Sequence, residues 1–254
     1  MAHRMLTAER EQRILQLLKG QEVISVAVLK EQLGTSEATV RRDLQSMHER
    51  GLLERLRGGA AVKSGGKTEP LFADKADLNG EAKQRIAEAA LALIHDHDTI
   101  FLDGGSTVLR LAKLLESRKD LTVVTDSLMA ASALMETGHR LILPGGEFRA
   151  ISRTLVGPLS ASVMGEISVD KAFMGTFGYT VKDGMSTTDP NEAFTKEQAM
   201  RRARTVILLA DHTKLGWSSF IKCSCDHLDI LVTDEIKDDM RKELEEKNVK
   251  IMLA

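Results

Sequence analysis

The sequence predicts an α/β protein in two parts: a small helical domain that ends in a β-hairpin, then a mostly parallel, helix-covered α/β domain. In the first sixty residues, apolar residues recur at helical spacing between capping residues and glycines. From residue 81 onwards, short apolar runs alternate with amphipathic segments, which is the pattern of a parallel sheet covered by helices. The two parts also differ in net charge, which is +3 over residues 1–63 and −5 over the remainder.

The composition is that of a soluble globular protein and excludes several other classes. Of 254 residues, 43% are hydrophobic and 28% are charged, so the chain is neither collagen-like nor disordered. No apolar run approaches the roughly 20 residues that span a bilayer, and the N-terminal segment lacks the apolar core of a signal peptide. The two cysteines, Cys223 and Cys225, are one residue apart, which is poor spacing for a loop-closing disulfide. We therefore expect a protein of the reducing cytoplasm.

Three helices and a hairpin are expected in the N-terminal domain. Each helix follows a side chain that can cap its first turn, and the first two end at a glycine. Two short alternating runs around a Gly-Gly pair then predict the hairpin. The expected helices run from Thr7 to Gly20, from Ser25 to Gly34, and from Thr35 or Ser36 to about Arg50, and the hairpin turns at Gly58-Gly59.

The second and third of these helices have the spacing of a helix-turn-helix, in which the start of the last helix enters the major groove of DNA. With Val40 and Leu44 buried, the polar residues beside them face outward, where Arg binds guanine or phosphate and Ser or Thr binds phosphate. A solvated helix face is the plainer alternative, but the spacing, the caps and the basic hairpin agree on DNA binding. The candidate DNA-binding residues are Ser25, Thr35, Ser36, Glu37, Thr39, Arg41 and Arg42 in the helices, and Arg55 and Arg57 in the hairpin, which would form a wing.

Composition sets the expected domain boundaries. Residues 60–80 are rich in Gly, Lys, Asp and small side chains and show no sustained period, so they are typical of a linker. Within them, the apolar pair Leu71-Phe72 is expected to dock on one of the domains. We expect a winged helix-turn-helix domain over residues 1–62, a linker over 63–80 and an α/β domain over 81–254.

The second domain alternates strands and helices. Apolar runs such as TIFL and TVILLA are typical of strands buried on both faces of a parallel sheet. Strands are expected at 99–102, 121–124, 140–143, 171–174, 205–210, 228–232 and 249–253, and helices at 81–95, 107–116, 128–137, 191–203 and 235–247.

Polar turns follow five of these strands, at the carboxyl ends where open α/β sheets bind ligands. The turn Gly104–Thr107 leads into a helix and offers backbone N–H groups, hydroxyls and a positive helix end, which suits a phosphate. Lys214 can add a point charge. Each turn alone also fits an ordinary cap or tight turn, but five at one edge favour a small anionic ligand. They are Asp103–Thr107, Thr125–Ser127, Pro144–Glu147, Gly175–Gly178 and Asp211–Lys214.

These motifs resemble those of the DeoR family of bacterial transcriptional regulators over nearly the whole chain. The specific N-terminal motifs are S-x-x-T-V-R-R-D-L from Ser36 and R-G-G-A from Arg57, and the C-terminal ones include DTIFLDGGST, DKAFMGTFG and VILLADHTKLG. The resemblance implies a winged helix-turn-helix head and a sensor domain similar in fold to ribose-phosphate isomerase-like proteins. It also implies a regulator rather than an enzyme, namely a repressor of a carbohydrate operon whose operator affinity a phosphorylated sugar controls.

The resemblance carries over residue by residue to an effector site. It implies that Gly104, Gly105, Ser106 and Thr107 hold phosphate beside Lys214, and that Asp103, Thr125, Asp126, Asp170, Glu192 and Lys196 meet the sugar hydroxyls. Asp126 stands where the family usually has Asn. A second carboxylate repels a nearby phosphate, so Asp126 either accepts hydrogen bonds from hydroxyls or marks a different ligand. The remaining candidates are Ser127, Gly145, Gly146, Gly175 and Asp211.

The expected partners are double-stranded operator DNA, the sugar phosphate and further copies of this chain. One small module rarely binds DNA with nanomolar specificity, so a dimer or tetramer on repeated half-sites is expected. We expect no cofactor and no membrane partner.

Two alternatives remain. A sugar-phosphate isomerase with an accessory DNA-binding head would use Glu192 or Asp170 with Lys196 or Lys214 for proton transfer. Such enzymes carry a denser acidic motif than the D-K-A-F-M-G of this chain, which favours sensing. The run Cys223-x-Cys225-x-His227 suggests a zinc site, but structural zinc sites prefer wider cysteine spacing, so we expect no metal.

Overall fold

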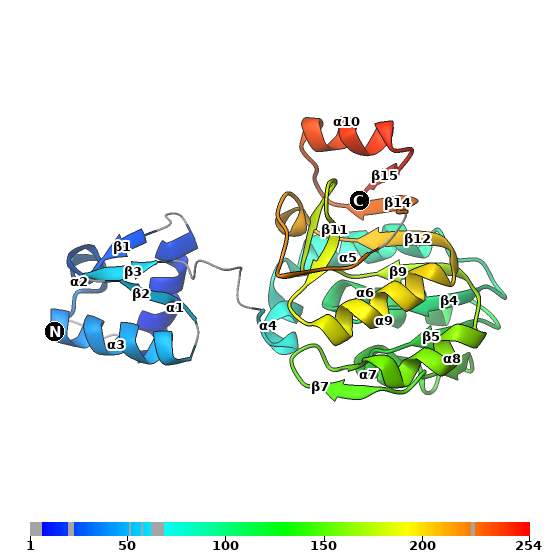
Figure 1. The fold of residues 1–254 in the computed structure, drawn as a ribbon, viewed down its shortest axis with the longest axis horizontal. Helices are drawn as coiled ribbons and strands as arrows, with labels where there is room; N and C mark the ends of the chain where they lie inside the picture. The colour runs from blue at the N-terminus through cyan, green and yellow to red at the C-terminus, as the bar shows by residue number, and fades with distance from the viewer. Residues whose placement is uncertain (1–6, 20–22, 51, 57, 62–68, 225–226) are drawn as a thin grey trace. The chain divides into compact units, whose positions relative to one another are not determined.

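The computed structural model describes residues 7–19, 23–50, 52–56, 58–61, 69–224 and 227–254, and its chain separates into two compact units, residues 1–68 and 69–254 (Figure 1). The first unit, called the head below, is a three-helix domain with a small antiparallel sheet. The second unit, called the body, is a parallel α/β domain. The fold class predicted from the sequence is confirmed. Within the described residues, no helix is both long and apolar enough to cross a membrane.

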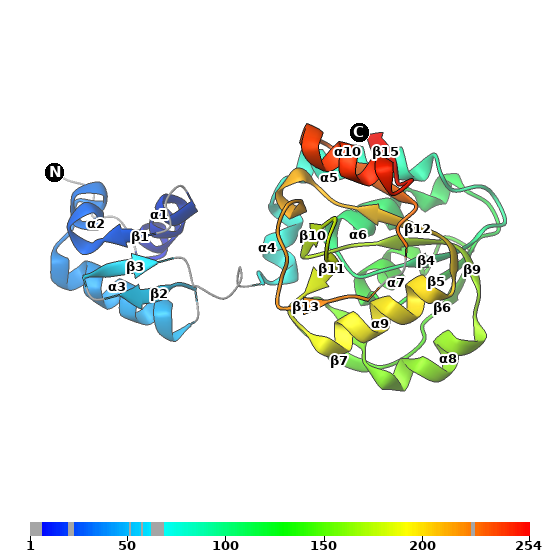
Figure 2. The same ribbon diagram turned by 45° about the horizontal axis from the view of Figure 1, so that its top comes forward.

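The head packs its helices against a three-stranded antiparallel sheet in the order β1-β3-β2 (Figure 2). Ile14, Leu29, Leu44 and Met47 are fully buried at the centre of its core. β1 was not predicted from the sequence, because a three-residue strand is too short to show an alternation of apolar and polar residues. The elements are α1 (Thr7–Lys19), β1 (Val23–Ser25), α2 (Val26–Leu33), α3 (Glu37–Glu49), β2 (Glu54–Leu56) and β3 (Gly59–Ala61).

The caps predicted from the sequence hold the two helices of the helix-turn-helix. Ser25 Oγ accepts from the N–H of Val28 at the start of α2. Gly34 ends that helix at a φ of 59°, a left-handed conformation that glycine adopts without a steric cost. Ser36 Oγ then accepts from the N–H of Thr39 at 3.2 Å and begins α3. Local chemistry therefore sets the turn between the two helices.

A buried ion pair ties α3 to α1. Arg10 Nε donates to Asp43 Oδ2 at 2.7 Å, and an Arg10 Nη donates to the other oxygen of the same carboxylate at 3.0 Å. Both side chains are at least nine-tenths buried. Paired in this way the two charges satisfy each other, but either one alone would be buried without compensation.

We expect Asp43→Ala to destabilise the head by about 3 kcal/mol or more, because it strands the Arg10 charge. Calorimetry of the full chain should then show an early transition for the head and an unchanged transition for the body. Glu49→Ala, at an exposed position of the same helix, is the matched control. An Asp43→Ala head as stable as the Glu49→Ala head would contradict a structural role for the pair.

The body is built on a seven-stranded parallel sheet in the order β15-β14-β12-β9-β4-β5-β6. Every adjacent pair of its strands is parallel. The strands are β4 (Thr99–Leu102), β5 (Thr122–Thr125), β6 (Arg140–Ile142), β9 (Val169–Met174), β12 (Ala203–Leu209), β14 (Ile230–Thr233) and β15 (Lys250–Leu253).

Helices cover both faces of this sheet, and the strands alternate their side chains between two cores (Figure 1). In β4, Ile100 and Leu102 join the core under α5, α6 and α7, while Phe101 joins the core under α8 and α9. This burial on both sides is why the strands appear as continuous apolar runs. The helices are α5 (Gly80–Leu91), α6 (Ser106–Leu114), α7 (Leu128–Leu134), α8 (Ala161–Glu166), α9 (Pro190–Arg201) and α10 (Asp238–Glu246).

The structure differs from the sequence prediction in the expected linker. The body begins at Glu69, and a short helix, α4 (Phe72–Asp77), lies within the range 63–80. Phe72 is 4% exposed, and its N–H donates to the carbonyl of Ile151 at 2.9 Å. Of the pair predicted to dock, Phe72 is buried against the body and Leu71 is exposed. Residues 63–68 lie outside the described part.

Short antiparallel elements were also missed. They are the hairpin β7 (Glu147–Arg149) and β8 (Thr154–Val156), and the small sheet of β10 (Gly178–Thr180), β11 (Gly184–Thr187) and β13 (Ile221–Lys222). Strands of two to four residues carry no measurable period in a sequence.

Candidate functional site

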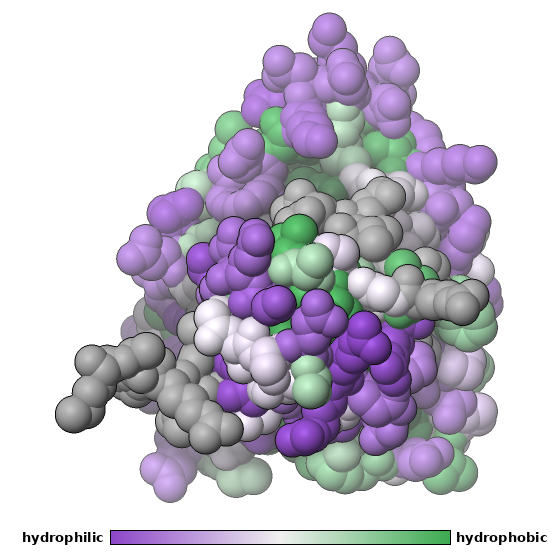
Figure 3. All heavy atoms as spheres, turned by 90° about the vertical axis from the view of Figure 1, so that its left-hand side faces the viewer, coloured by the Kyte–Doolittle hydropathy of each residue, from purple (hydrophilic) through white to green (hydrophobic). Residues whose placement is uncertain are grey.

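The first helical turns of α3 present a polar surface. Glu37, Arg41 and Arg42 are exposed, and Arg41 lies 3.5 Å from Glu37 in a loose i,i+4 ion pair. Ser36 and Thr39 join their hydroxyls at 2.9 Å beside them, and Thr35 lies in the turn before. The face drawn in Figure 3 is mainly hydrophilic, with small hydrophobic areas between. The structure thus brings the predicted helix residues onto one accessible stretch.

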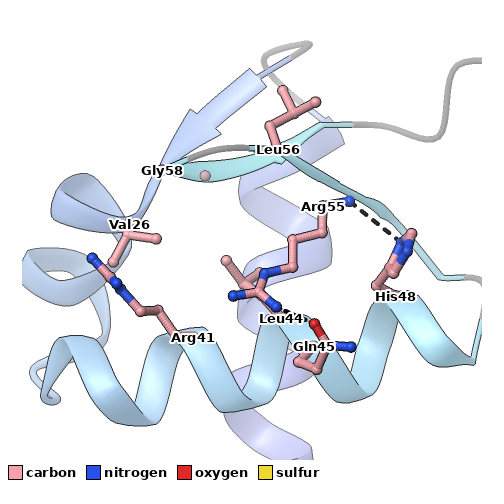
Figure 4. A pocket seen from close by; sticks show the side chains of 9 residues that line it. Val26, Arg41, Leu44, Gln45, His48, Arg55, Leu56 and Gly58 are labelled. Atoms are coloured by element: carbon pink, nitrogen blue, oxygen red, sulfur yellow. Dashed lines mark hydrogen bonds between the residues drawn. The ribbon is translucent and has the colours of Figure 1, made fainter.

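A groove of about 710 Å³ separates α3 from the hairpin (Figure 4). Arg41 and Gln45 extend from α3, and Arg55 reaches from β2 to donate a hydrogen bond to the Gln45 side chain. The N–H of Arg55 also lies 3.4 Å from His48 Nδ1. Arg55 therefore joins the helix residues, whereas Arg57 lies outside the described residues.

At the carboxyl edge of the body's sheet, glycines allow three segments to approach closely. A Cβ at Gly104 would lie 2.2 Å from Thr154 Cγ2, and a Cβ at Gly175 would lie 2.7 Å from the Gly104 carbonyl oxygen. Gly105 has a φ of 146° and begins α6. The turn after β4 is therefore packed against the turn after β9 and against β8, with the N–H groups of α6 behind it.

Cations gather beside the start of α6. The carbonyl of Lys75 accepts from Ser106 Oγ at 3.2 Å and from Lys83 Nζ at 2.5 Å, so the buried Lys83 ammonium lies next to Ser106. Lys75 Nζ and Lys214 Nζ lie 5.8 and 5.5 Å from the centre of the Phe177 ring. Lys83 thus lies next to the turn that was predicted to hold phosphate, and Lys75 and Lys214 lie close enough to Lys83 to affect its charge.

Burial lowers the pKa of Lys83 to about 8; Asp211 opposes this shift, while Lys214 and Arg110 add to it. An anion placed next to Lys83 would favour its charged form and so oppose the effect of burial.

A buried ion pair forms the other half of the site. Lys196 from α9 donates to Asp103 Oδ2 at the end of β4 and to the Gly175 carbonyl at 3.1 Å. The same Asp103 oxygen accepts from the N–H of Gly175 at 2.8 Å. Burial alone would lower the pKa of Lys196, but the charges of Asp103 and Glu192 raise it above its ordinary value. Lys196 is therefore a permanent cation.

Three carboxylate oxygens around this pair have no hydrogen-bond partner among the described residues: Asp103 Oδ1, Asp126 Oδ1 and Glu192 Oε2, of which the last lies in an ion pair with Arg149. The two aspartate side chains are both 1% exposed. Burial raises the pKa of Asp126 well above its usual range, and repulsion by Asp103 raises it further. A buried acceptor without a hydrogen bond lowers the stability of the fold. The carboxyl groups of Asp103 and Asp126 therefore suit a ligand that donates hydroxyl hydrogen bonds.

Several other predicted residues have structural tasks at this edge. Thr125 Oγ1 donates to the Leu102 carbonyl at 2.7 Å, and Ser127 caps α7. Asp211 accepts from the N–H of Thr213 and so shapes the turn that bears Lys214. In the turn after β6, Gly145 and Gly146 have φ values of 81° and 134°, and Gly146 packs on the backbone of Val156.

Asp170 does not join the site, which corrects its assignment to the sugar hydroxyls. It lies at the amino-terminal end of β9, where it accepts from the N–H of Thr99 at 2.9 Å and pairs with Arg204 at 3.2 Å. This is the edge of the sheet opposite the polar turns. The strand expected at 171–174 already placed Asp170 at its amino end, and the assignment to the sugar hydroxyls came from the family resemblance alone.

Sequence reasoning missed Lys75 and Lys83. Lys83 lies in an amphipathic helix, where a lysine is usually solvated, and only the fold shows that α4 covers it. Glu192 was predicted from the sequence as a site residue, and its Oε2 lies 3.1 Å from a guanidinium nitrogen of Arg149.

The candidate zinc run does not form a reactive centre in the described residues. Burial raises the pKa of the Cys223 thiol to about 12, so it remains protonated at neutral pH. Cys225 lies outside the described residues, and the described part of the chain contains no group of three potential metal ligands.

A helix-turn-helix joined to a sheet-edge ligand site defines a DNA-binding regulator with a sensor domain. Residues 10–65 match the model of the DeoR-like helix-turn-helix domain, and residues 78–235 match the model of the DeoR C terminal sensor domain. The chain belongs to the DeoR family of transcriptional regulators.

Known relatives align over nearly the whole chain. The HTH-type transcriptional regulator GlpR of Haloferax volcanii is 35% identical, over 98% of each chain. The HTH-type transcriptional regulator IolR of Bacillus subtilis is 32% identical over 91% of this chain and 92% of that one. A putative aga operon transcriptional repressor of Escherichia coli O157:H7 is 29% identical over 98% and 94%. These relatives confirm the regulator prediction and do not favour the isomerase alternative.

Among solved structures, the ribose 5-phosphate isomerase A of Methanocaldococcus jannaschii has a TM-score of 0.41 and 19% identity, over 54% of this chain and 55% of that one. A similarity of this size supports no argument about activity.

We expect Asp126→Asn to stabilise the protein at pH 7, because burial and the neighbouring Asp103 raise the pKa of Asp126 and so make its ionised form unfavourable. A buried Asp whose pKa is raised favours folding when protonated, and its contribution is lost as the pH rises through the raised value. The difference from wild type should therefore shrink as the pH falls towards about 4. Thermal unfolding across this pH range measures it, with the exposed Glu136→Gln as the control for charge. An Asp126→Asn protein that is less stable than wild type at every pH would contradict the raised pKa.

Proposed function

We propose that this chain is a repressor of a carbohydrate operon whose operator affinity is controlled by a phosphorylated sugar bound at the carboxyl edge of the body's sheet. The observation that carries this proposal is the division of charge at that edge. Lys83 lies beside the first turn of α6, and Lys75 and Lys214, both against the Phe177 ring, lie near enough to Lys83 to act on its charge. Asp103 and Asp126 offer unpaired acceptors beside Lys196. A sugar phosphate has the matching polarity, with an anion at one end and hydroxyl donors at the other.

Operator binding falls to the head. Arg41, Arg42 and Arg55 supply positive charge around α3 and the groove, and Ser36 and Thr39 supply hydroxyls for phosphate oxygens. Affinity from such contacts falls steeply with salt. The chain works as a homo-oligomer in the cytoplasm, because repeated half-sites add the affinity that one head lacks. The names of the relatives, one of which is an operon repressor, support the repressor assignment.

Control requires that the sugar phosphate bind the DNA-competent and DNA-incompetent states with different affinities. Couplings of this kind are typically about 1–3 kcal/mol, or 5- to 150-fold in affinity.

We expect Arg41→Ala to weaken operator binding by roughly 5- to 150-fold, the cost of one good base or phosphate contact. Fluorescence anisotropy with DNA from the upstream region of its own gene measures the change. Arg13→Ala, at an exposed position of α1, is the matched control. Sugar-phosphate binding should be unchanged in both variants, and its loss in Arg41→Ala would contradict the division of labour between head and body.

We expect the affinity for ribose 5-phosphate to fall by roughly three- to tenfold between pH 7 and 9, as Lys83 loses its proton. The phosphate is a dianion throughout this range because its second pKa is about 6. Lys83→Arg keeps its charge, so its affinity should change little with pH. Calorimetric titrations of both proteins provide the comparison. Identical pH profiles would remove Lys83 from the phosphate site.

A further inference from the structure

A buried chain of charges leads from the sheet-edge site to the first residue of the body. Glu69 is where the described residues resume after the head, and its side chain is 5% exposed. Its Oε2 lies 2.6 Å from a guanidinium nitrogen of Arg149, and another nitrogen of that group lies 3.1 Å from Glu192. Glu192 lies 3.6 Å from Lys196 Nζ, which binds Asp103. Acidic and basic side chains therefore alternate from the sheet-edge site to Glu69, the first residue of the body.

Arg149 connects Glu69 to Glu192 in this series of charged side chains. Its guanidinium contacts Glu69 and Glu192, and its Nε lies 3.7 Å from Asp189. It also donates to Thr188 Oγ1 at 2.9 Å and to Ser152 Oγ at 3.1 Å. The planar fork of an arginine can hold several acceptors at fixed angles, whereas a lysine offers a single point charge. Arg149 belongs to β7, which also begins the hairpin on which α4 docks through Phe72.

The contacts of Glu69 link Arg149 to α4 as well. Lys75 of α4 binds the second Glu69 oxygen at 2.5 Å, and Thr188 donates to the first. Burial alone would raise the pKa of Glu69, but Arg149 and Lys75 lower it to about 2. Glu69 is thus an anion held between the hairpin and α4.

Because these charged side chains are buried, a change in the partner of one of them affects the contacts of the next. Buried charges are costly when unpaired, so a group that loses its partner must find another. A ligand that takes hydrogen bonds from Lys196, or gives them to Asp103, weakens their mutual pair. The Lys196 to Glu192 separation of 3.6 Å leaves room to shorten. The contact between Glu192 and Arg149 would then weaken, and the Arg149 guanidinium would interact more strongly with Glu69.

We propose that Arg149 transmits occupancy of the sheet-edge site to the segment that begins at Glu69, and through it to the DNA affinity of the head. This inference rests on the proposed control by a sugar phosphate. Arg149 is a positioning residue, because it acts through Glu192 and Glu69 and not by touching ligand or DNA.

The first test compares Arg149→Lys and Arg149→Gln with wild type in the full chain. Arg149→Lys keeps the buried charge and guards against failure to fold. Arg204→Gln, which removes an exposed arginine at the opposite edge of the sheet, is the matched control. Calorimetry measures binding of ribose 5-phosphate, and anisotropy measures DNA dissociation constants with and without it.

Both Arg149 variants should bind ribose 5-phosphate and free DNA about as wild type does, within roughly threefold. The ratio of the two DNA dissociation constants, about fivefold or more in wild type, should fall to near one. A wild-type ratio in Arg149→Lys would overturn the proposal.

The second test needs no ligand. Hydrogen exchange of the full chain should show that Asp103→Asn speeds exchange of the amides of α4 about threefold or more, and that Arg149→Lys abolishes this effect. An equal effect in both backgrounds would assign the link to the Ser106 contact with Lys75 and overturn the role of Arg149. If no sugar phosphate alters DNA binding by wild type, the proposed function fails, and the exchange experiment still decides whether Arg149 transmits.

Discussion

The ion pair between Asp103 and Lys196 is the interaction on which the organisation of the site depends. It joins the end of β4 to the middle of α9, and its oxygen and nitrogen also hold the backbone of Gly175 after β9. Neither charge is tolerable alone where the side chains are 1–2% exposed. The pair therefore fixes two strand ends and a helix relative to one another. The unpaired Oδ1 of Asp103 follows from that arrangement, since Lys196 and the N–H of Gly175 both bind the other oxygen.

The proposed sugar-phosphate ligand matches the way in which charge is divided at the sheet edge. Cations lie beside the N-terminus of α6, and carboxylates lie beside Lys196. A simple anion would satisfy only the first group, and a neutral sugar only the second. The raised pKa of Asp126 lessens the repulsion that a second carboxylate would exert on a phosphate. The Asp at this position is thus compatible with a phosphorylated ligand.

Local signals made much of the fold predictable from the sequence. Ser25 and Ser36 cap their helices because a cap needs only the next three residues, and buried parallel strands are visible as apolar runs. The candidate site was partly predictable, since the carboxyl ends of parallel strands share one edge. Lys83 was not predicted because its burial depends on α4. Asp170 was misassigned because the family resemblance was followed although the residue lies at the amino end of its strand. Arg149 lies in a three-residue strand, and its acidic partners come from two distant segments, at Glu69 and at the start of α9.

We propose that a phosphorylated sugar controls DNA binding by this chain. The most direct measurement is fluorescence anisotropy on upstream DNA with a mixture of sugar phosphates and with the same mixture after phosphatase treatment. The account predicts that the intact mixture shifts the DNA dissociation constant and that the dephosphorylated mixture does not. Equal effects of the two mixtures, or no effect of either on specific DNA binding, would contradict it.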